Sequence, residues 1–312
     1  MPASLLNLPI EIVFLIAREL GSGDIISLLG TCPCLNILLA RALIDNVCCD
    51  LDSARARRAL YCAAEDRNKS VTQQLLDRGV FGGLLPRRRL LHEAVSVKKE
   101  EVAQTLLECG LDPEARNEDG WTALALAAAA GKEKVIRMLL ERDDVNVNAR
   151  AGEGLTPLTA AIRAGKVDIV KIFLDHPRID VSIPNVNGYT PLHNAIACRD
   201  RRNVYYMLRY CPRLRLNSGH LTHGTPLQAA AMRGDVNIVR ALLRKRSVNI
   251  NSQDCYGDTP LHWAAKGVHK GVVSLLLERG ADFRVKNFNG DSVAMLARTY
   301  NPTIKGIIER YL

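Results

Sequence analysis

Cysteine is the residue type in this chain that first suggests chemistry, because thiols can bind metals or act as nucleophiles. Cys32 and Cys34 flank a proline, and Cys48 and Cys49 are adjacent. A zinc site needs four ligands, and neither group is followed by a second pair at zinc-finger spacing. We therefore predict no metal, and we interpret the nine cysteines as thiols of a reducing compartment.

Histidine is the other candidate. His220 and His223 are three residues apart but would need two further ligands to hold a metal. His92, His193 and His262 lie in a recurring phrase, where we expect each imidazole to bond a neighbouring turn. The chain has no phosphate-binding glycine loop, no nucleophile elbow and no zinc-protease motif. We therefore predict no cofactor and no enzymatic activity.

The recurring phrase organises most of the chain. Thr-Pro-Leu begins at Thr156, Thr190, Thr225 and Thr259, and weaker copies precede these four. Successive marker leucines are 31 to 35 residues apart: Leu60, Leu91, Leu124, Leu158, Leu192, Leu227 and Leu261. Ala294 follows 33 residues after the last leucine. A period of this size indicates a stack of helical repeats rather than separate globular domains.

Each phrase has the chemistry of a helix start. Threonine can cap the helix, and proline suits the first helical position because its missing N–H costs nothing there. The apolar residues that follow bury one side of a short helix. Gly131, Gly165 and Gly234 suit the positive φ that ends such a helix. A second apolar-periodic stretch predicts another helix, and an Asn- and Gly-rich stretch predicts a hairpin-like turn.

These phrases resemble the ankyrin repeat, whose signature is Thr-Pro-Leu-His-x-Ala. The resemblance implies an all-α fold, with an ankyrin solenoid of about eight units over residues 56–312. The first and last units depart most from the pattern, as expected for capping repeats. We expect residues 46–55 to be a linker.

The leading segment, residues 1–45, does not fit the repeat. Ile12, Ile16 and Leu20 recur on one face of a predicted helix, and Asp24 can cap a second helix. The segment resembles an F-box, a short helical motif that docks the adaptor Skp1. The resemblance implies that Skp1 contacts Leu8, Pro9, Ile12, Ile16, Leu20, Ile25 and Leu28.

Together the two resemblances imply a substrate-recognition subunit of a Skp1–cullin–F-box ubiquitin ligase. The alternative is a non-ligase ankyrin scaffold or inhibitor whose N-terminal helices only cap the array. Ankyrin arrays are similar to one another in that they bind partner proteins through their concave side. The repeat phase places nine residues on that side, and the resemblance implies that they contact an unknown target protein: Trp121, Glu153, Arg163, Tyr189, Met232, Arg233, Tyr256, Lys266 and Phe288. Aromatic residues framed by charge are typical of binding hot spots.

Charge and hydropathy limit the other partners. The formal net charge is +9, and its basic runs at 87–89, 199–202 and 244–246 lie at different phases of the repeat. We expect them to scatter over the surface, whereas a nucleic-acid site needs one continuous basic patch with aromatic residues. The longest apolar-looking uncharged run, residues 25–40, is short for a membrane span. We predict no nucleic-acid or membrane partner, no secretory signal, and a cytoplasmic or nuclear location.

Overall fold

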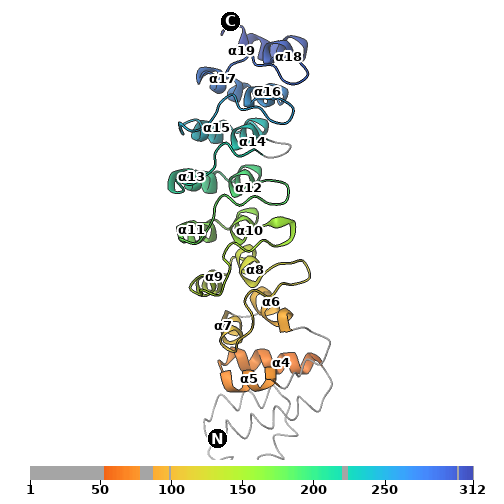
Figure 1. Cartoon of the computed structure of the whole chain (residues 1–312), viewed down its shortest axis with the longest axis vertical. Coiled ribbons are helices and arrows are strands. Elements are labelled where there is room, and N and C mark those ends of the chain that lie inside the picture. Colours follow the sequence, from red (N-terminus) through yellow and green to blue (C-terminus); the bar gives the residue numbers. More distant parts are fainter. Residues whose placement is uncertain (1–52, 78–86, 98–99, 220–223, 301, 312) are drawn as a thin grey trace, which may run out of the picture. The chain divides into compact units, whose positions relative to one another are not determined.

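The computed structural model describes residues 53–77, 87–97, 100–219, 224–300 and 302–311 (Figure 1). The segment that resembles an F-box, its seven predicted Skp1 contacts, and the cysteine and histidine pairs considered for metal lie outside these residues. The described residues form helices joined by turns and loops. They contain no β-strand, and Lys286 and Ser292 form an isolated antiparallel bridge. The prediction of an all-helical fold is confirmed for this part of the chain.

The described helices follow the predicted alternation of first and second helices. Their bounds are α4 Ser53–Glu65, α5 Lys69–Asp77, α6 Arg87–Val97, α7 Glu100–Glu108, α8 Ala123–Ala130, α9 Glu133–Leu140, α10 Pro157–Arg163, α11 Val167–Asp175, α12 Pro191–Ala197, α13 Arg201–Tyr210, α14 Pro226–Arg233, α15 Val236–Leu242, α16 Pro260–Lys266, α17 Lys270–Glu278, α18 Val293–Tyr300 and α19 Pro302–Ile308. A 3-10 turn, η3, spans Gly152–Gly154. None of these helices has the length and apolar character that crossing a bilayer requires.

Two compact units share these helices. The first holds the described residues up to Ala127 together with Lys132–Asn146. Within it, α4 packs on α5 and α7, and α7 packs on α6 and α9. Helix α4 begins at Ser53, inside the segment expected to be a linker.

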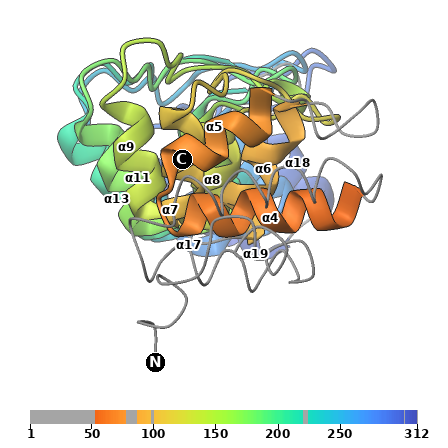
Figure 2. The ribbon, with the colours of Figure 1, turned by 90° about the horizontal axis from the view of Figure 1, so that it is seen from below.

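The second unit holds Ala128–Gly131 and the residues from Val147 onward. Its first helices form one row, α10, α12, α14, α16 and α18, in which each packs on the next. Its second helices form a parallel row, α11, α13, α15, α17 and α19. Viewed from the end, α11 and α13 lie together on one side, away from the loops (Figure 2). The loops project from the row of first helices.

The start of each first helix confirms the predicted cap. The hydroxyls of Thr156, Thr190, Thr225 and Thr259 each accept a hydrogen bond from the backbone N–H three residues later. Proline occupies the first helical position in all four. The cap satisfies an amide that the helix itself cannot, so the phrase fixes where each repeat begins.

The core is built from the marker leucines. All seven, from Leu60 to Leu261, are at most 1% exposed. Alanines one turn away, such as Ala161 and Ala230, are fully buried and let neighbouring helices approach closely. In the last unit the equivalent residue, Ala294, is only half-buried. This difference fits a terminal repeat, which has a neighbour on one side only.

The helix ends show a feature that the sequence pattern missed. Gly131, Gly165 and Gly234 follow their first helices with positive φ, as predicted. The equivalent positions in three other repeats are occupied by Arg67, Arg199 and Val268, with φ of 56°, 55° and 56°. The left-handed region is costly for a side chain with a Cβ, and most costly for a branched one such as valine. The repeat geometry imposes this conformation even where the sequence lacks glycine.

Candidate protein-binding surface

The loops between repeats end in hairpin-like turns with a common design. The first residue of the turn is Asn117, Asn185, Asp254 or Asn287, and its side-chain oxygen accepts backbone N–H groups from within the turn. A glycine with positive φ follows three residues later, as at Gly257. These bonds hold the turn in one conformation, so the residue at its tip has a fixed position.

The signature histidines join each first helix to the next turn. His92 Nε2 lies 2.9 Å from the Trp121 carbonyl oxygen, and His193 Nε2 lies 3.1 Å from that of Gly224. His262 Nε2 lies 3.1 Å from the Asp291 carbonyl oxygen. These contacts confirm the structural role predicted for the three imidazoles.

Gln228 stands in the histidine position of its repeat and performs the same task. Its Nε2 donates to the carbonyl oxygens of Asp258, at 2.7 Å, and Ser252, at 3.1 Å. Burial lowers the pKa of His262 below the ordinary 6.5, although the bond to the Asp291 carbonyl opposes the shift. The buried, neutral imidazole of His262 therefore bonds the next turn, as the amide of Gln228 does in the preceding repeat.

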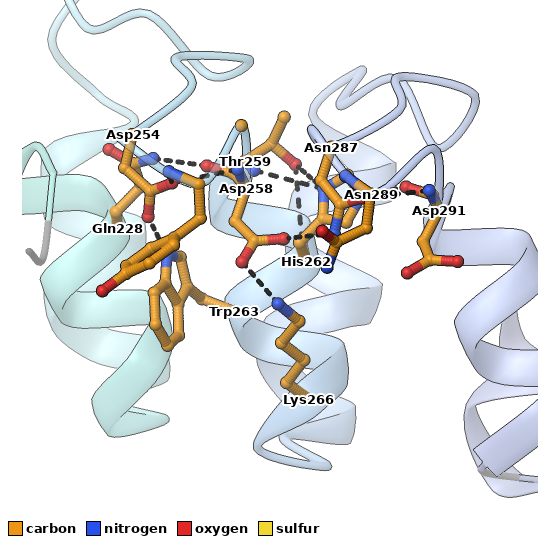
Figure 3. A network of polar contacts seen from close by, with 12 residues as sticks. Gln228, Asp254, Asp258, Thr259, His262, Trp263, Lys266, Asn287, Asn289 and Asp291 are labelled. Atoms are coloured by element: carbon orange, nitrogen blue, oxygen red, sulfur yellow. Dashed lines mark hydrogen bonds and ion pairs between the residues drawn. The ribbon is translucent and has the colours of Figure 1, made fainter.

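A polar network supports the turn that carries Tyr256 (Figure 3). The side chain of Asp258 is 1% exposed, and its carboxylate forms an ion pair with Lys266. Its other oxygen accepts from Asn287 Nδ2 at 3.0 Å. Asp254 accepts from Trp263 Nε1 at 2.6 Å, and Lys266 lies over the Trp263 ring at 5.5 Å. The network ties α16 to its own turn and to the next one.

The most exposed apolar side chains of the predicted surface lie on these adjoining turns. Tyr256 is 54% exposed and Phe288 is 75% exposed. The Phe288 N–H donates to the Tyr256 carbonyl oxygen at 3.0 Å, so the two tips are joined through their backbones. Lys266 is held beside the same turn by its ion pair with Asp258. The structure thus brings together three of the residues predicted to bind a target.

A second pair of predicted contacts, Glu153 and Arg163, lies near the start of the second compact unit. Glu153 has a φ of 58°, and its carboxylate accepts from Arg163 at 2.6 Å. The Glu153 carbonyl oxygen accepts from the N–H of Val186, a side chain that is 63% exposed. Both charged groups face solvent and are available to a partner.

The remaining predicted contacts are less uniform. Tyr189 is half-buried, with its ring edge-on to His193 at 6.0 Å. Met232 is also half-buried, and its carbonyl oxygen lies 2.9 Å from His269 Nε2, whereas Arg233 is exposed. Trp121, in the first unit, is half-buried, and its backbone carbonyl oxygen is the one that lies 2.9 Å from His92 Nε2. Tyr189 and Trp121 are therefore only partly exposed.

Other chemistry is not apparent in the part of the chain that the structure describes. It contains no cluster of His, Cys, Asp or Glu suited to a metal ion. None of its five cysteines forms a disulfide. Burial raises the pKa of the Cys109 and Cys211 thiols, which keeps them protonated.

Comparison with known proteins identifies the family of the repeats. A family model for ankyrin repeats matches three times, over residues 86–151, 144–218 and 211–287. No F-box model matches the chain. The chain is 30% identical over 230 residues to human transient receptor potential cation channel subfamily A member 1. That match covers 72% of this chain but 20% of the channel, and the chain spans a fifth or less of the curated relatives that it matches.

Solved structures give the same fold. The ankyrin repeat domain of Bcl-3, a member of the IkappaB protein family, superposes with a TM-score of 0.58 at 21% identity, covering 80% of this chain and 97% of that domain. An ankyrin repeat domain from Acinetobacter baumannii superposes with a TM-score of 0.55 at 27% identity, covering 60% and 96%. With its capped helices, buried marker leucines and linked turns, the chain belongs to the ankyrin-repeat family, a fold suited to protein–protein interaction.

Proposed function

We propose that the chain is the substrate-recognition subunit of a Skp1–cullin–F-box ubiquitin ligase. Residues 1–45 bind Skp1, and the turns and first helices of the array hold a target protein. The chain itself carries out no chemistry. Holding the target near the charged conjugating enzyme raises the effective concentration of its lysines.

One observation carries this proposal: the pattern from Leu8 to Leu28 precedes a repeat array built for binding proteins. The spacing of Ile12, Ile16 and Leu20 gives one apolar helix face in a segment too short to bury it alone. A partner such as Skp1 would cover that face. The array supports the other half of the proposal, because its turns hold Tyr256 and Phe288 in fixed, exposed positions.

Binding to purified Skp1 tests the adaptor half. We expect the full chain to co-elute with Skp1 and the Leu8→Ala/Ile12→Ala variant to lose this binding. Circular dichroism should show the same helix content and unfolding transition for the array in both proteins. Undiminished Skp1 binding by the variant, or none by the wild type, would favour the non-ligase scaffold instead.

The target half is tested by the reciprocal variant. Tyr256→Ala/Phe288→Ala removes two exposed side chains, so we expect at least one co-purified partner to be lost while Skp1 stays bound. A hot-spot pair contributes on the order of 2 kcal/mol or more to binding. Trp121→Ala/Tyr189→Ala tests the half-buried members of the surface in the same way. An unchanged partner list for both variants would place the target elsewhere.

A further inference from the structure

The positive charge of the chain is concentrated in one stretch. Residues 199–248 contain eleven Arg and Lys residues against two Asp. Their net charge of +9 equals that of the entire chain, so the remaining residues sum to zero. Ten of the eleven cations are arginine, the side chain suited to paired hydrogen bonds with carboxylates.

The fold brings much of this charge onto one face. Helices α13 and α15 are neighbours in the row of second helices. On α13, Arg202, Tyr205 and Arg209 are exposed at spacings of three and four residues, which places them on one side of the helix. Arg240 on α15 and Arg244, two residues after this helix ends at Leu242, are also exposed. We expected the basic runs to scatter, but Arg209 and Arg240 link the runs at 199–202 and 244–246 on this face. Arg209 and Arg244 share one repeat position, and Tyr205 and Arg240 share another.

Little of this charge is neutralised within the protein. Arg201 bonds the buried Asp235 carboxylate at 2.9 Å and so belongs to the structure. The described residues provide no ion pair for Arg202, Arg209, Arg240 or Arg244. Four arginines therefore face solvent on α13, on α15 and just after α15, with further exposed cations at Lys245, Arg246, Arg213 and Arg215.

Tyrosines make the face more than a charged surface. Tyr205 is 42% exposed and Tyr210 is 55% exposed. Tyr206 anchors the group, because its hydroxyl donates to Asp175 at 2.9 Å and its ring lies 4.6 Å from that of Tyr210. Arg209 lies over the Tyr210 ring at 5.4 Å. Arginine and tyrosine are, with tryptophan, the side chains enriched in binding hot spots.

Acidic residues border this face on both sides. Asp175 on α11 and Glu278 on α17 occupy the repeat position of Arg209, on α13, and of Arg244, just after α15. Both carboxylate residues are exposed. At this one repeat position the sign runs negative, positive, positive, negative along four successive repeats. With helix axes about 8–10 Å apart, the positive strip is about 20 Å wide.

We propose that the exposed face of α13 and α15 is a docking surface for an acidic polypeptide segment. An extended segment of about six residues spans this width. Its carboxylates would pair with the arginines, and its side chains would contact Tyr205 and Tyr210. A bounded strip favours a short acidic segment over a nucleic acid, whose backbone continues beyond the strip and would meet Asp175 or Glu278. The surface lies on the second helices, so the inference does not depend on Skp1 binding or on the turns.

Fluorescence anisotropy with a labelled octaglutamate peptide tests the proposal on the full chain. We expect Arg209→Glu/Arg244→Glu to weaken binding by about tenfold or more. The matched control, Arg284→Glu/Arg310→Glu, changes the net charge equally at exposed sites in the same unit. We expect it to weaken binding less than about twofold if the strip, and not the overall charge, holds the peptide. Circular dichroism should confirm that both variants are folded.

Each other outcome overturns the proposal. No peptide binding by the wild type, or equal losses in the two variants, would show that the strip is not a docking surface for acidic segments. Tighter binding of an oligothymidylate than of the peptide, lost in Arg209→Glu/Arg244→Glu, would assign the strip to a nucleic acid. Binding to phosphatidylcholine vesicles that contain phosphatidylserine, with no peptide binding, would assign it to a membrane surface.

Discussion

Asp258 and Lys266 form an ion pair in which the carboxylate is buried and the amine reaches solvent. A second pair three repeats earlier, Glu153 and Arg163, is exposed at both ends. Arg163 and Lys266 occupy the same position in their repeats, but the acids do not: Glu153 stands at the position of Tyr256 and is exposed, whereas Asp258 stands two positions later and is buried. That difference separates a structural contact from a surface one.

Asp258→Ala should therefore lower the free energy of unfolding by about 1.5–3 kcal/mol, because the buried Asn287 amide loses its charged acceptor. Glu153→Ala removes an exposed carboxylate that is also paired with a cation and should cost less than about 1 kcal/mol. Urea titration of the two variants measures both changes. Equal costs would contradict the role assigned to burial of the Asp258 carboxylate.

His262 makes stability depend on pH. Its folded-state pKa is lowered mainly by burial, so the unfolded chain binds a proton more readily. Its contribution to stability is fully present above the unfolded value near 6.5 and is lost as the pH falls through the lower folded value. His262→Gln copies Gln228, which bonds the next turn without titrating. The loss of thermal stability between pH 7.5 and about 5.5 should be smaller in this variant than in the wild type. Parallel curves for the two proteins would contradict the assignment.

Val268 should be a site of stored backbone strain. Replacing it by glycine, as in three other repeats, should raise the free energy of unfolding by about 1 kcal/mol, because φ is 56° there. Gly165→Val is the matched reverse change, since a Cβ at Gly165 would have no heavy atom within 4 Å. It should cost a similar amount through the backbone alone. Opposite shifts in urea midpoint would confirm both; a destabilised Val268→Gly protein would show that side-chain packing outweighs the strain.

Leu192 tests the register of the repeats. It is 1% exposed in the middle of the array, so Leu192→Ala should cost about 2–5 kcal/mol. Each repeat is stabilised by its neighbours, so this change should broaden or split the thermal transition as well as lower it. Met295→Ala, at a position 50% exposed in the last repeat, should change stability by less than about 0.5 kcal/mol. An unchanged transition for Leu192→Ala would mean that the leucine register is wrong.

Much of the fold was available from the sequence because its signals are local and repeated. A threonine, a proline and a leucine at fixed spacing determine where a helix begins and which face it buries, whatever follows. Seven copies of the leucine then set the period of the stack. The bonds from His92, His193 and His262 to the next turn follow from the same regularity, because every repeat meets an equivalent neighbour.

The binding surface was predictable in position but not in exposure. The repeat phase assigned Tyr189 and Tyr256 to one surface, yet Tyr189 is half-buried against His193 whereas Tyr256 is largely free. Whether a tyrosine at this surface is half-buried or exposed depends on the side chains that face its turn, and the repeat phase alone does not specify them.

Tertiary structure alone decided the features that depart from the repeat. Asp258 is buried because Asn287, 29 residues away, covers its carboxylate, and Val268 is left-handed because the stack imposes that geometry on a residue that disfavours it. Arginines from α13 and α15, which the sequence places 31 or more residues apart, lie on one face because the two helices pack side by side. Local sequence fixes the start and the buried face of each helix, whereas burial and charge at the surface are set by neighbours that only the packed stack brings together.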